Sequence, residues 1–188
     1  MLGWLVEKRL AAFEKSFDYD VEYMRDMYAT SPRAFWKFSK ILKLSEHRED
    51  VPKEAWYAAK IVATLAEDCG PCTQLVATMA ERAGVKPETL RAIVTGNEAA
   101  MPEDAALGWR FARSVLARDI AESDRLREKV VDRWGRRALV SLALTIASSR
   151  VYPALKYGLG HGHACVRLQI GGAELPVRAE AQAAKSGR

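Results

Sequence analysis

The stretch VATLAEDCGPCTQLVATMAERAGV, residues 62–85, decides the fold that we expect for this chain. Apolar residues recur at helical spacing on both sides of Gly70-Pro71. Because proline lacks a backbone donor and crowds the preceding turn, one helix does not continue unbroken through this point. The stretch therefore predicts two consecutive helices, over residues 52–68 and 71–83.

Helical patterns continue on both sides of this stretch. Ser31, followed by Pro32, has the typical pattern of a helix N-terminus, and Asp20 is a second candidate cap. The helices predicted ahead of the stretch cover residues 2–17, 20–28 and 31–44. Those predicted after it are 87–96, 102–122, a helix capped by Ser123, and 136–157 beyond a break at Gly135.

A charged segment, residues 45–50, divides the predicted helices into two groups. We expect an N-terminal helical appendage over residues 1–45 and a helical core over residues 51–158. Residues 159–188 form a C-terminal extension, which ends in a polar tail. The predicted fold class is therefore all-α, a helical bundle with an N-terminal appendage.

The extension contains the one pattern that is typical of strands. Apolar residues alternate on both sides of Gly171-Gly172, at Val166, Leu168, Ile170, Leu175 and Val177. This pattern predicts a short hairpin, although Pro176 weakens its second strand. Because a lone hairpin is marginal in water, we expect this one to lie against another element.

The composition is that of a globular protein, with 49% hydrophobic and 28% charged residues in 188. The basic residues between 125 and 137 alternate with Asp124, Glu128 and Asp132, so they do not form the uninterrupted basic stripe of a nucleic-acid surface. The N-terminus lacks a signal-peptide pattern, and no apolar run reaches the ~18 residues of a membrane span. We expect a cytoplasmic protein that binds neither nucleic acid nor membrane.

Two of the three cysteines stand at the predicted helix start, as Cys69 and Cys72. The free N–H groups of a first helical turn stabilise a thiolate, and two intervening residues allow a disulfide without large backbone movement. This pattern favours a redox-active pair in a reducing compartment. Two alternatives stay open: half of a zinc site without a second pair, and inert packing of two small apolar side chains.

The surroundings of the cysteines resemble a known family. A helix, Cys69-Gly70-Pro71-Cys72, a helix ending in Ala83-Gly84-Val85, the sequence Lys86-Pro87-Glu88-Thr89-Leu90 and a later Phe111-Ala112-Arg113 are similar to the alkylhydroperoxidase D / carboxymuconolactone decarboxylase family. The resemblance covers roughly residues 51–158. It implies an all-α bundle, assembly into dimers or larger rings, and thiol-dependent peroxide or disulfide chemistry.

The chain departs from the family pattern at the proton relay. Peroxidase members have a glutamate twelve residues before the first cysteine and a histidine four residues after the second. Tyr57 and Val76 occupy these positions, and Pro71 stands where other members have a histidine. Tyr57 is a candidate proton donor as well as an ordinary core aromatic residue.

Helical geometry suggests an order of reaction for the two cysteines. Val76 lies on the same helix face as Cys72, where an apolar neighbour favours the neutral thiol. Gln74 lies about 200° around the helix and does not replace a base. We therefore expect Cys69, at the helix mouth, to attack and Cys72 to resolve, with Lys60 favouring ionisation.

A second group of chemically active residues follows the last helix. In an extended segment His161, His163 and Cys165 share a face, and such a set suits zinc or copper. A fourth ligand is not identifiable, so a solvated loop is the favoured interpretation and the metal site is the alternative. A third interpretation is that one of these histidines replaces the missing relay base.

These observations predict a homo-oligomeric thiol–disulfide redox protein acting through Cys69, Cys72 and Tyr57, without a cofactor. Its substrate is a small-molecule peroxide or disulfide, and the sequence does not name the electron donor. Two other functions remain as alternatives. One is a non-redox enzyme of the carboxymuconolactone decarboxylase kind, and the other is a helical interaction protein that has lost its catalytic activity.

Overall fold

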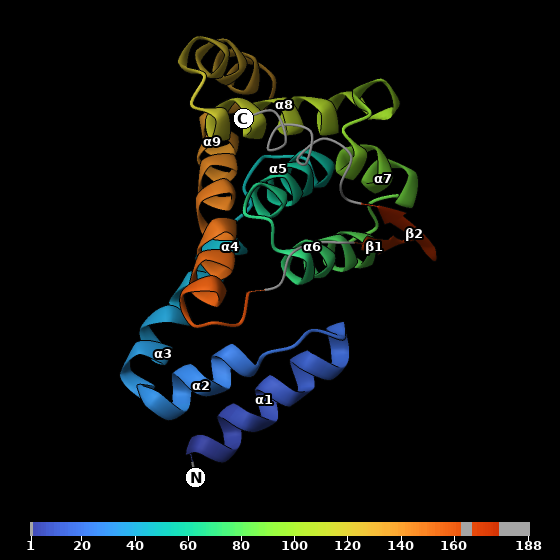
Figure 1. Cartoon of the computed structure of the whole chain (residues 1–188). Coiled ribbons are helices and arrows are strands. Elements are labelled where there is room, and N and C mark those ends of the chain that lie inside the picture. Colours follow the sequence, from blue (N-terminus) through green and yellow to red (C-terminus); the bar gives the residue numbers. More distant parts are fainter. Residues whose placement is uncertain (1, 163–166, 177–188) are drawn as a thin grey trace, which may run out of the picture.

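A computed structural model describes residues 2–162 and 167–176, and within these ranges the chain is all-α with one short hairpin (Figure 1). This confirms the predicted fold class. The helices and strands are α1 (Leu2–Phe17), α2 (Glu22–Thr30), α3 (Pro32–Phe38), α4 (Lys40–Ser45), α5 (Lys53–Ala66), α6 (Gly70–Arg82), α7 (Pro87–Thr95), the 3₁₀ turn η1 (Glu98–Ala100), α8 (Glu103–Ala117), α9 (Ile120–Gly158), β1 (Arg167–Ile170) and β2 (Ala173–Pro176).

The core forms where α5 packs against α8 and α9. Small side chains make this close packing possible: Ala55, Ala59 and Ala63 of α5 are fully buried, as is Ala105 of α8. Gly108 of α8 lies directly against the backbone of α5. Helices whose interface is lined by small residues approach each other closely, so α5 is enclosed and fixes the start of the segment that leads to the cysteines.

Helix α9 is interrupted at Gly135, as the sequence predicts. Gly135 has φ 84° and ψ 174°, a backbone conformation outside the helical region. By length and composition α9 is able to cross a membrane, although the sequence patterns alone predict no such span. In this structure 44% of its apolar window is buried inside the protein, where Leu142 and Ile146 belong to the core.

Several predicted helix boundaries are wrong, and among them is the start of the second helix, which begins at Glu22 with Val21 rather than Asp20 as its N-cap residue. Helix α8 ends at Ala117 rather than at residue 122, because Arg118 adopts a left-handed conformation with φ 58°. Asp119 and not Ser123 caps α9, since the Asp119 carboxylate accepts a hydrogen bond from the backbone N–H of Glu122 (3.1 Å). The predicted helix over residues 31–44 is divided into α3 and α4, while its cap at Ser31 is confirmed.

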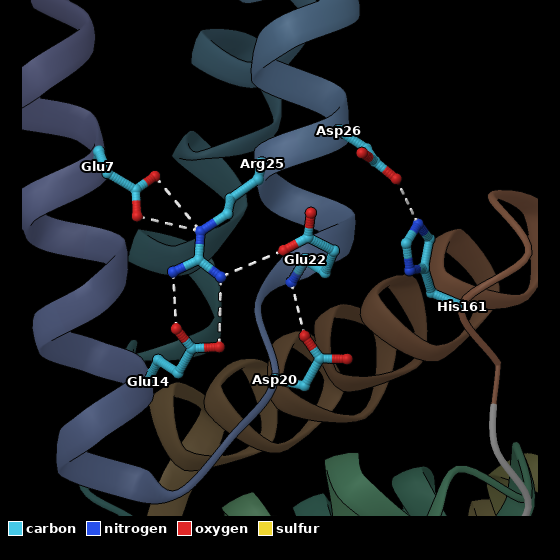
Figure 2. A network of polar contacts seen from close by, with 7 residues as sticks. All are labelled: Glu7, Glu14, Asp20, Glu22, Arg25, Asp26 and His161. Atoms are coloured by element: carbon cyan, nitrogen blue, oxygen red, sulfur yellow. Dashed lines mark hydrogen bonds and ion pairs between the residues drawn. The ribbon is translucent and has the colours of Figure 1, made fainter.

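The appendage helices α1 and α2 lie side by side and are joined by a charged network (Figure 2). The Arg25 guanidinium of α2 pairs with three carboxylates, those of Glu7 and Glu14 on α1 and of Glu22 on α2. His161, after α9, lies 2.6 Å from the Asp26 carboxylate of α2. These polar contacts join α1 to α2, and they join α2 to the segment that follows α9.

The C-terminal hairpin lies against α6 and α7, as a marginal hairpin requires. The Gln74 amide accepts from the N–H of Gln169 (2.8 Å) and donates to its carbonyl (2.9 Å), as an added strand would. The Glu81 carboxylate accepts from the N–H of Gly171, and Leu168 and Ile170 are buried beneath. The hairpin prediction is confirmed for residues 167–176; Val166, Val177 and the polar tail lie outside the described residues.

Candidate redox site at Cys69 and Cys72

Cys69 and Cys72 form a disulfide at the start of α6, with their Cα atoms 5.3 Å apart. Asp68 has φ 52°, and this left-handed residue turns the chain from the end of α5 into α6. The extended Cys69 is the N-cap residue of α6. Its carbonyl accepts from both the backbone N–H and the hydroxyl of Thr73, each at 3.0 Å. The backbone around the pair is therefore held in place by its own helix.

The two sulfurs differ in what they face. Cys69 has no exposed surface, whereas Cys72 is 3% exposed and lines a cavity of about 100 Å³. Cys69, at the start of α6, is fully buried, and this removes the geometric basis for expecting it to attack the substrate. The cavity is lined by Phe13, Tyr19, Tyr23, Leu42, Ser45, Lys60, Thr64, Cys72, Leu75, Val76, Met79, Ser149 and Tyr152.

Tyr19 supplies a polar contact to the Cys72 sulfur. Its hydroxyl oxygen lies 3.7 Å from Sγ of Cys72, and both side chains are buried. Because a disulfide sulfur carries no hydrogen, the tyrosine is the donor in this state. Tyr19 belongs to the connection between α1 and α2, 53 positions away along the chain. The appendage therefore completes the surroundings of a core cysteine.

Burial keeps this tyrosine neutral. Desolvation raises the pKa of Tyr19 to about 12, although a hydrogen bond with Tyr23 opposes the rise. Desolvation also raises the pKa of Tyr23 well above its usual value. Lys156, 1% exposed, places Nζ 4.7 Å from the Tyr19 ring centroid and 5.1 Å from that of Tyr23. Burial lowers the pKa of Lys156, while the charge of Asp20 acts in the opposite direction.

Lys60, on α5, is the charged side chain among the cavity residues. It is 7% exposed, and its Nζ lies 4.1 Å from the centroid of the Trp56 ring. Burial lowers the pKa of Lys60 to about 8, and the nearby charge of Glu46 raises it against this effect. Ser149 also lines the cavity, and its hydroxyl is buried without a hydrogen-bond partner among the described residues. Lys60 and Ser149 are thus a buried lysine and a buried serine with an unpartnered hydroxyl among the residues that line the cavity with Cys72.

The residues at the two relay positions lie in different surroundings. Val76 lines the cavity beside Cys72, as its helical spacing predicts. Tyr57 is half-buried and packs edge-on against Trp56, with ring centroids 5.0 Å apart. Burial raises the pKa of Tyr57. Tyr57 is not among the cavity residues, so the described structure brings Tyr19 and not Tyr57 to the sulfur.

The C-terminal group is only partly described. His161 is paired with Asp26 and is not among the residues that line the cavity with Cys72, so it does not supply the relay base in this arrangement. His163 and Cys165 lie outside the described residues. Within residues 2–162 and 167–176 no group of three histidine, cysteine or carboxylate side chains is arranged to hold a metal ion.

Sequence reasoning identified the cysteine pair, Val76 and Lys60, but it missed Tyr19 and Ser149. Both missed residues reach the cavity through tertiary packing, and no local spacing relates them to Cys72. The one available signal was the short break at residues 18–19 between the helices predicted over residues 2–17 and 20–28. Comparisons with protein-family models, curated proteins and solved structures find no match for this chain. The family resemblance therefore stays a prediction from the sequence.

Proposed function

We propose that this protein is a thiol–disulfide oxidoreductase in which the Cys69–Cys72 pair cycles between dithiol and disulfide. The observation that carries the proposal is the position of Cys72. It lines a small cavity together with the buried Lys60 and with Tyr19, whose hydroxyl contacts the Cys72 sulfur. A nearby cation lowers the pKa of a thiol and makes it reactive, whereas a purely structural disulfide does not require one.

In this proposal Cys72 meets the substrate and Cys69 resolves. The Cys72 thiolate attacks one sulfur of a small disulfide, forms a mixed disulfide and releases the first thiolate of the substrate. The Cys69 thiolate then attacks the Cys72 sulfur, which restores the Cys69–Cys72 bond and releases the second thiolate. Both substrate sulfurs are reduced and both cysteines are oxidised. An external dithiol returns the protein to its starting state.

Lys60 and Tyr19 together take the place of the family's glutamate and histidine relay. An amine with a pKa of about 8 exchanges protons efficiently near neutral pH, and in its charged form it favours the Cys72 thiolate. The neutral Tyr19 hydroxyl donates to the sulfur and stabilises the same anion. A peroxide is the second substrate class of this proposal. The Cys72 thiolate attacks one peroxide oxygen, breaks the O–O bond and releases the other oxygen as hydroxide or alkoxide, which leaves Cys72 as a sulfenic acid. Cys69 then displaces the sulfenic hydroxyl as water and forms the disulfide. We place the protein in the cytoplasm as a homo-oligomer.

The first experiment counts and ranks the thiols. In a Cys165→Ser background, we expect dithiothreitol to free two thiols and a small disulfide to remove both again. With each remaining cysteine alone, iodoacetamide is expected to label Cys72 in Cys69→Ser at least about tenfold faster than Cys69 in Cys72→Ser. Two thiols that stay alkylatable after oxidation would contradict the redox proposal and favour a helical interaction protein. Faster labelling of Cys69 would restore the order inferred from the sequence.

The second experiment removes the hydroxyl beside the sulfur. Tyr19→Phe is expected to raise the pKa of the Cys72 thiol by about 0.5–1 unit and to slow disulfide exchange about fivefold, since a donor to the anion is lost. The pKa is measured from the pH dependence of iodoacetamide labelling in the Cys69→Ser background. Tyr28→Phe serves as the control, because it removes a hydroxyl from a partly buried appendage tyrosine that lines neither cavity. An unchanged pH profile in Tyr19→Phe would show that its contact with Cys72 is only packing.

A further inference from the structure

A second, larger cavity adjoins the one at Cys72, and it is lined by the appendage helices together with Tyr152 of α9. It has a volume of about 290 Å³. Four of its residues, Phe13, Tyr23, Leu42 and Tyr152, also line the cavity at Cys72, so the two spaces adjoin across these side chains. The remaining lining residues are Val6, Arg9, Leu10, Val21, Met24, Phe35, Trp36, Phe38 and Ser39.

The two cavities differ in chemistry. The larger one is lined mainly by aliphatic and aromatic side chains. Arg9 is the charged residue that lines it among the described residues, and its side chain is exposed. The smaller one has the buried Lys60 and Ser149 among its lining residues. Among the residues that the structure describes, no aspartate or glutamate lines either cavity. A ligand that fits both spaces therefore has a negative or strongly accepting end and an apolar body.

We infer that the two cavities form one binding site for an elongated apolar carboxylate, with its head between Lys60 and Ser149 and its hydrocarbon body in the appendage cavity. This inference rests on the proposed function in one respect: it assigns a ligand class to the cavity at the proposed redox site. Binding of the ligand does not require the redox reaction. The lysine donates to the carboxylate as a charged group, and the serine hydroxyl gains a hydrogen-bond partner.

The size of the appendage cavity sets the length of the hydrocarbon body. A water molecule occupies ~30 Å³ in the liquid, so about 290 Å³ accommodates on the order of ten non-hydrogen atoms. A chain of about twelve carbons fills both spaces. Aromatic walls such as Phe35 and Phe38 bury such a chain and supply most of its affinity.

The charged network of the appendage keeps this cavity in shape (Figure 2). Val6, Leu10 and Phe13 line it from α1, and Tyr23 and Met24 line it from α2. The pairing of the α2 guanidinium with the two α1 carboxylates holds these helices together. The appendage therefore has a role in the inferred site: it forms the wall of the space for the ligand body and contributes Tyr19 at the sulfur.

The test measures dodecanoate binding to the oxidised protein by isothermal titration calorimetry. We expect saturable binding of one dodecanoate per chain with a micromolar dissociation constant. Lys60→Met is expected to weaken binding at least about tenfold, because the charged partner of the head is lost. Ser149→Ala is expected to weaken it about threefold. Lys129→Met removes the same charge at an exposed position of α9 that lines neither cavity, and it is expected to leave binding nearly unchanged.

A second arm tests the place of the hydrocarbon body. Met24 lines the larger cavity and not the one at Cys72. Met24→Trp is therefore expected to weaken dodecanoate binding at least about tenfold while thiol labelling stays as in wild type. Circular dichroism and thermal unfolding establish that each variant is folded. Absence of saturable binding up to about 1 mM dodecanoate, or equal binding by Lys60→Met and Lys129→Met, would overturn the inference.

The outcomes separate this inference from the redox proposal. The oxidised protein needs no electron donor, so dodecanoate binding is measured without any thiol chemistry. Loss of binding together with normal dithiol–disulfide cycling contradicts the ligand class alone. Normal binding together with inert cysteines contradicts the redox proposal alone, and it leaves the protein as a carrier of apolar carboxylates.

Discussion

Gly108→Ala is expected to destabilise the protein by about 3 kcal/mol or more, an effect at the upper end of what overpacking a core produces. A Cβ atom at residue 108 would lie 2.7 Å from the Cα atom of Ala55 and closer still to its carbonyl oxygen. Both obstacles are backbone atoms of α5, so no side-chain rotation relieves the clash. The two helices at the centre of the core must separate instead.

The measurement is urea unfolding at equilibrium, followed by circular dichroism. Gly158→Ala is the matched control, because this glycine also belongs to a helix, has no positive φ and would place its new Cβ atom in open space. Alanine is the better helix former, so the control is expected to be neutral or slightly stabilising. A loss of less than about 1 kcal/mol for Gly108→Ala would show that α5 and α8 are able to move apart easily.

The sequence predicts most of the helices because their ends have local chemical causes. Pro52, Pro87 and Pro102 each precede or begin a helix, and Gly84 and Gly96 each follow one with positive φ. The cysteine pair is visible for the same reason, since its spacing and its place at a helix start are local features. Such signals do not depend on which elements later pack together.

The parts that were not predicted arise from packing between distant segments. Arg118 ends α8 with a left-handed conformation, for which arginine carries no sequence signal. Tyr19 reaches Cys72 because the appendage folds against α6, and Ser149 reaches the same cavity from α9. A helical pattern shows which face of α9 is apolar, but it does not show which of its small polar residues faces a cavity. The full burial of Cys69 is likewise a result of tertiary packing that local sequence patterns do not show.

Among substitutions that remove a charge, we expect Lys60→Met to change the free energy of unfolding most. It is predicted to stabilise the oxidised protein by about 3 kcal/mol at pH 7. Burial lowers the pKa of Lys60 from 10.5 to about 8, and one pKa unit corresponds to about 1.4 kcal/mol. Methionine has a similar length and is not desolvated at such a cost. Its sulfur also packs favourably on an aromatic ring such as that of Trp56.

The pH dependence gives this prediction a distinctive form. Below about pH 8 both folded and unfolded wild type carry the Lys60 proton, so the folded state bears the full desolvation cost. Between about 8 and 10.5 the unfolded state binds more protons than the folded state, and wild type becomes more stable as pH rises. The advantage of Lys60→Met over wild type is therefore expected to shrink across this window and to vanish near its upper end.

Other buried groups, including Lys156, whose pKa burial also lowers, are present in both wild type and Lys60→Met, so their contributions cancel in the difference between the two proteins. Burial raises the pKa values of Tyr19, Tyr23 and Tyr152. Cys72 does not titrate while it is bonded to Cys69. Urea unfolding of wild type, Lys60→Met and the exposed-site control Lys129→Met across this pH range therefore isolates one group.

The same variant decides whether the protein keeps an unfavourable lysine for its chemistry. In the proposed function Lys60 favours the Cys72 thiolate, so Lys60→Met is expected to label with iodoacetamide about tenfold more slowly at pH 7, in the Cys69→Ser background. Functional sites often keep residues that lower the stability of the folded protein. A gain in stability together with a loss of thiol reactivity is therefore the result expected when a functional residue is replaced. If Lys60→Met is instead less stable than wild type at every pH, the amine holds the core through its contact with Trp56. Lys60 would then have no role in the redox mechanism. Lys156, whose amine lies over the Tyr19 ring, would become the candidate proton acceptor.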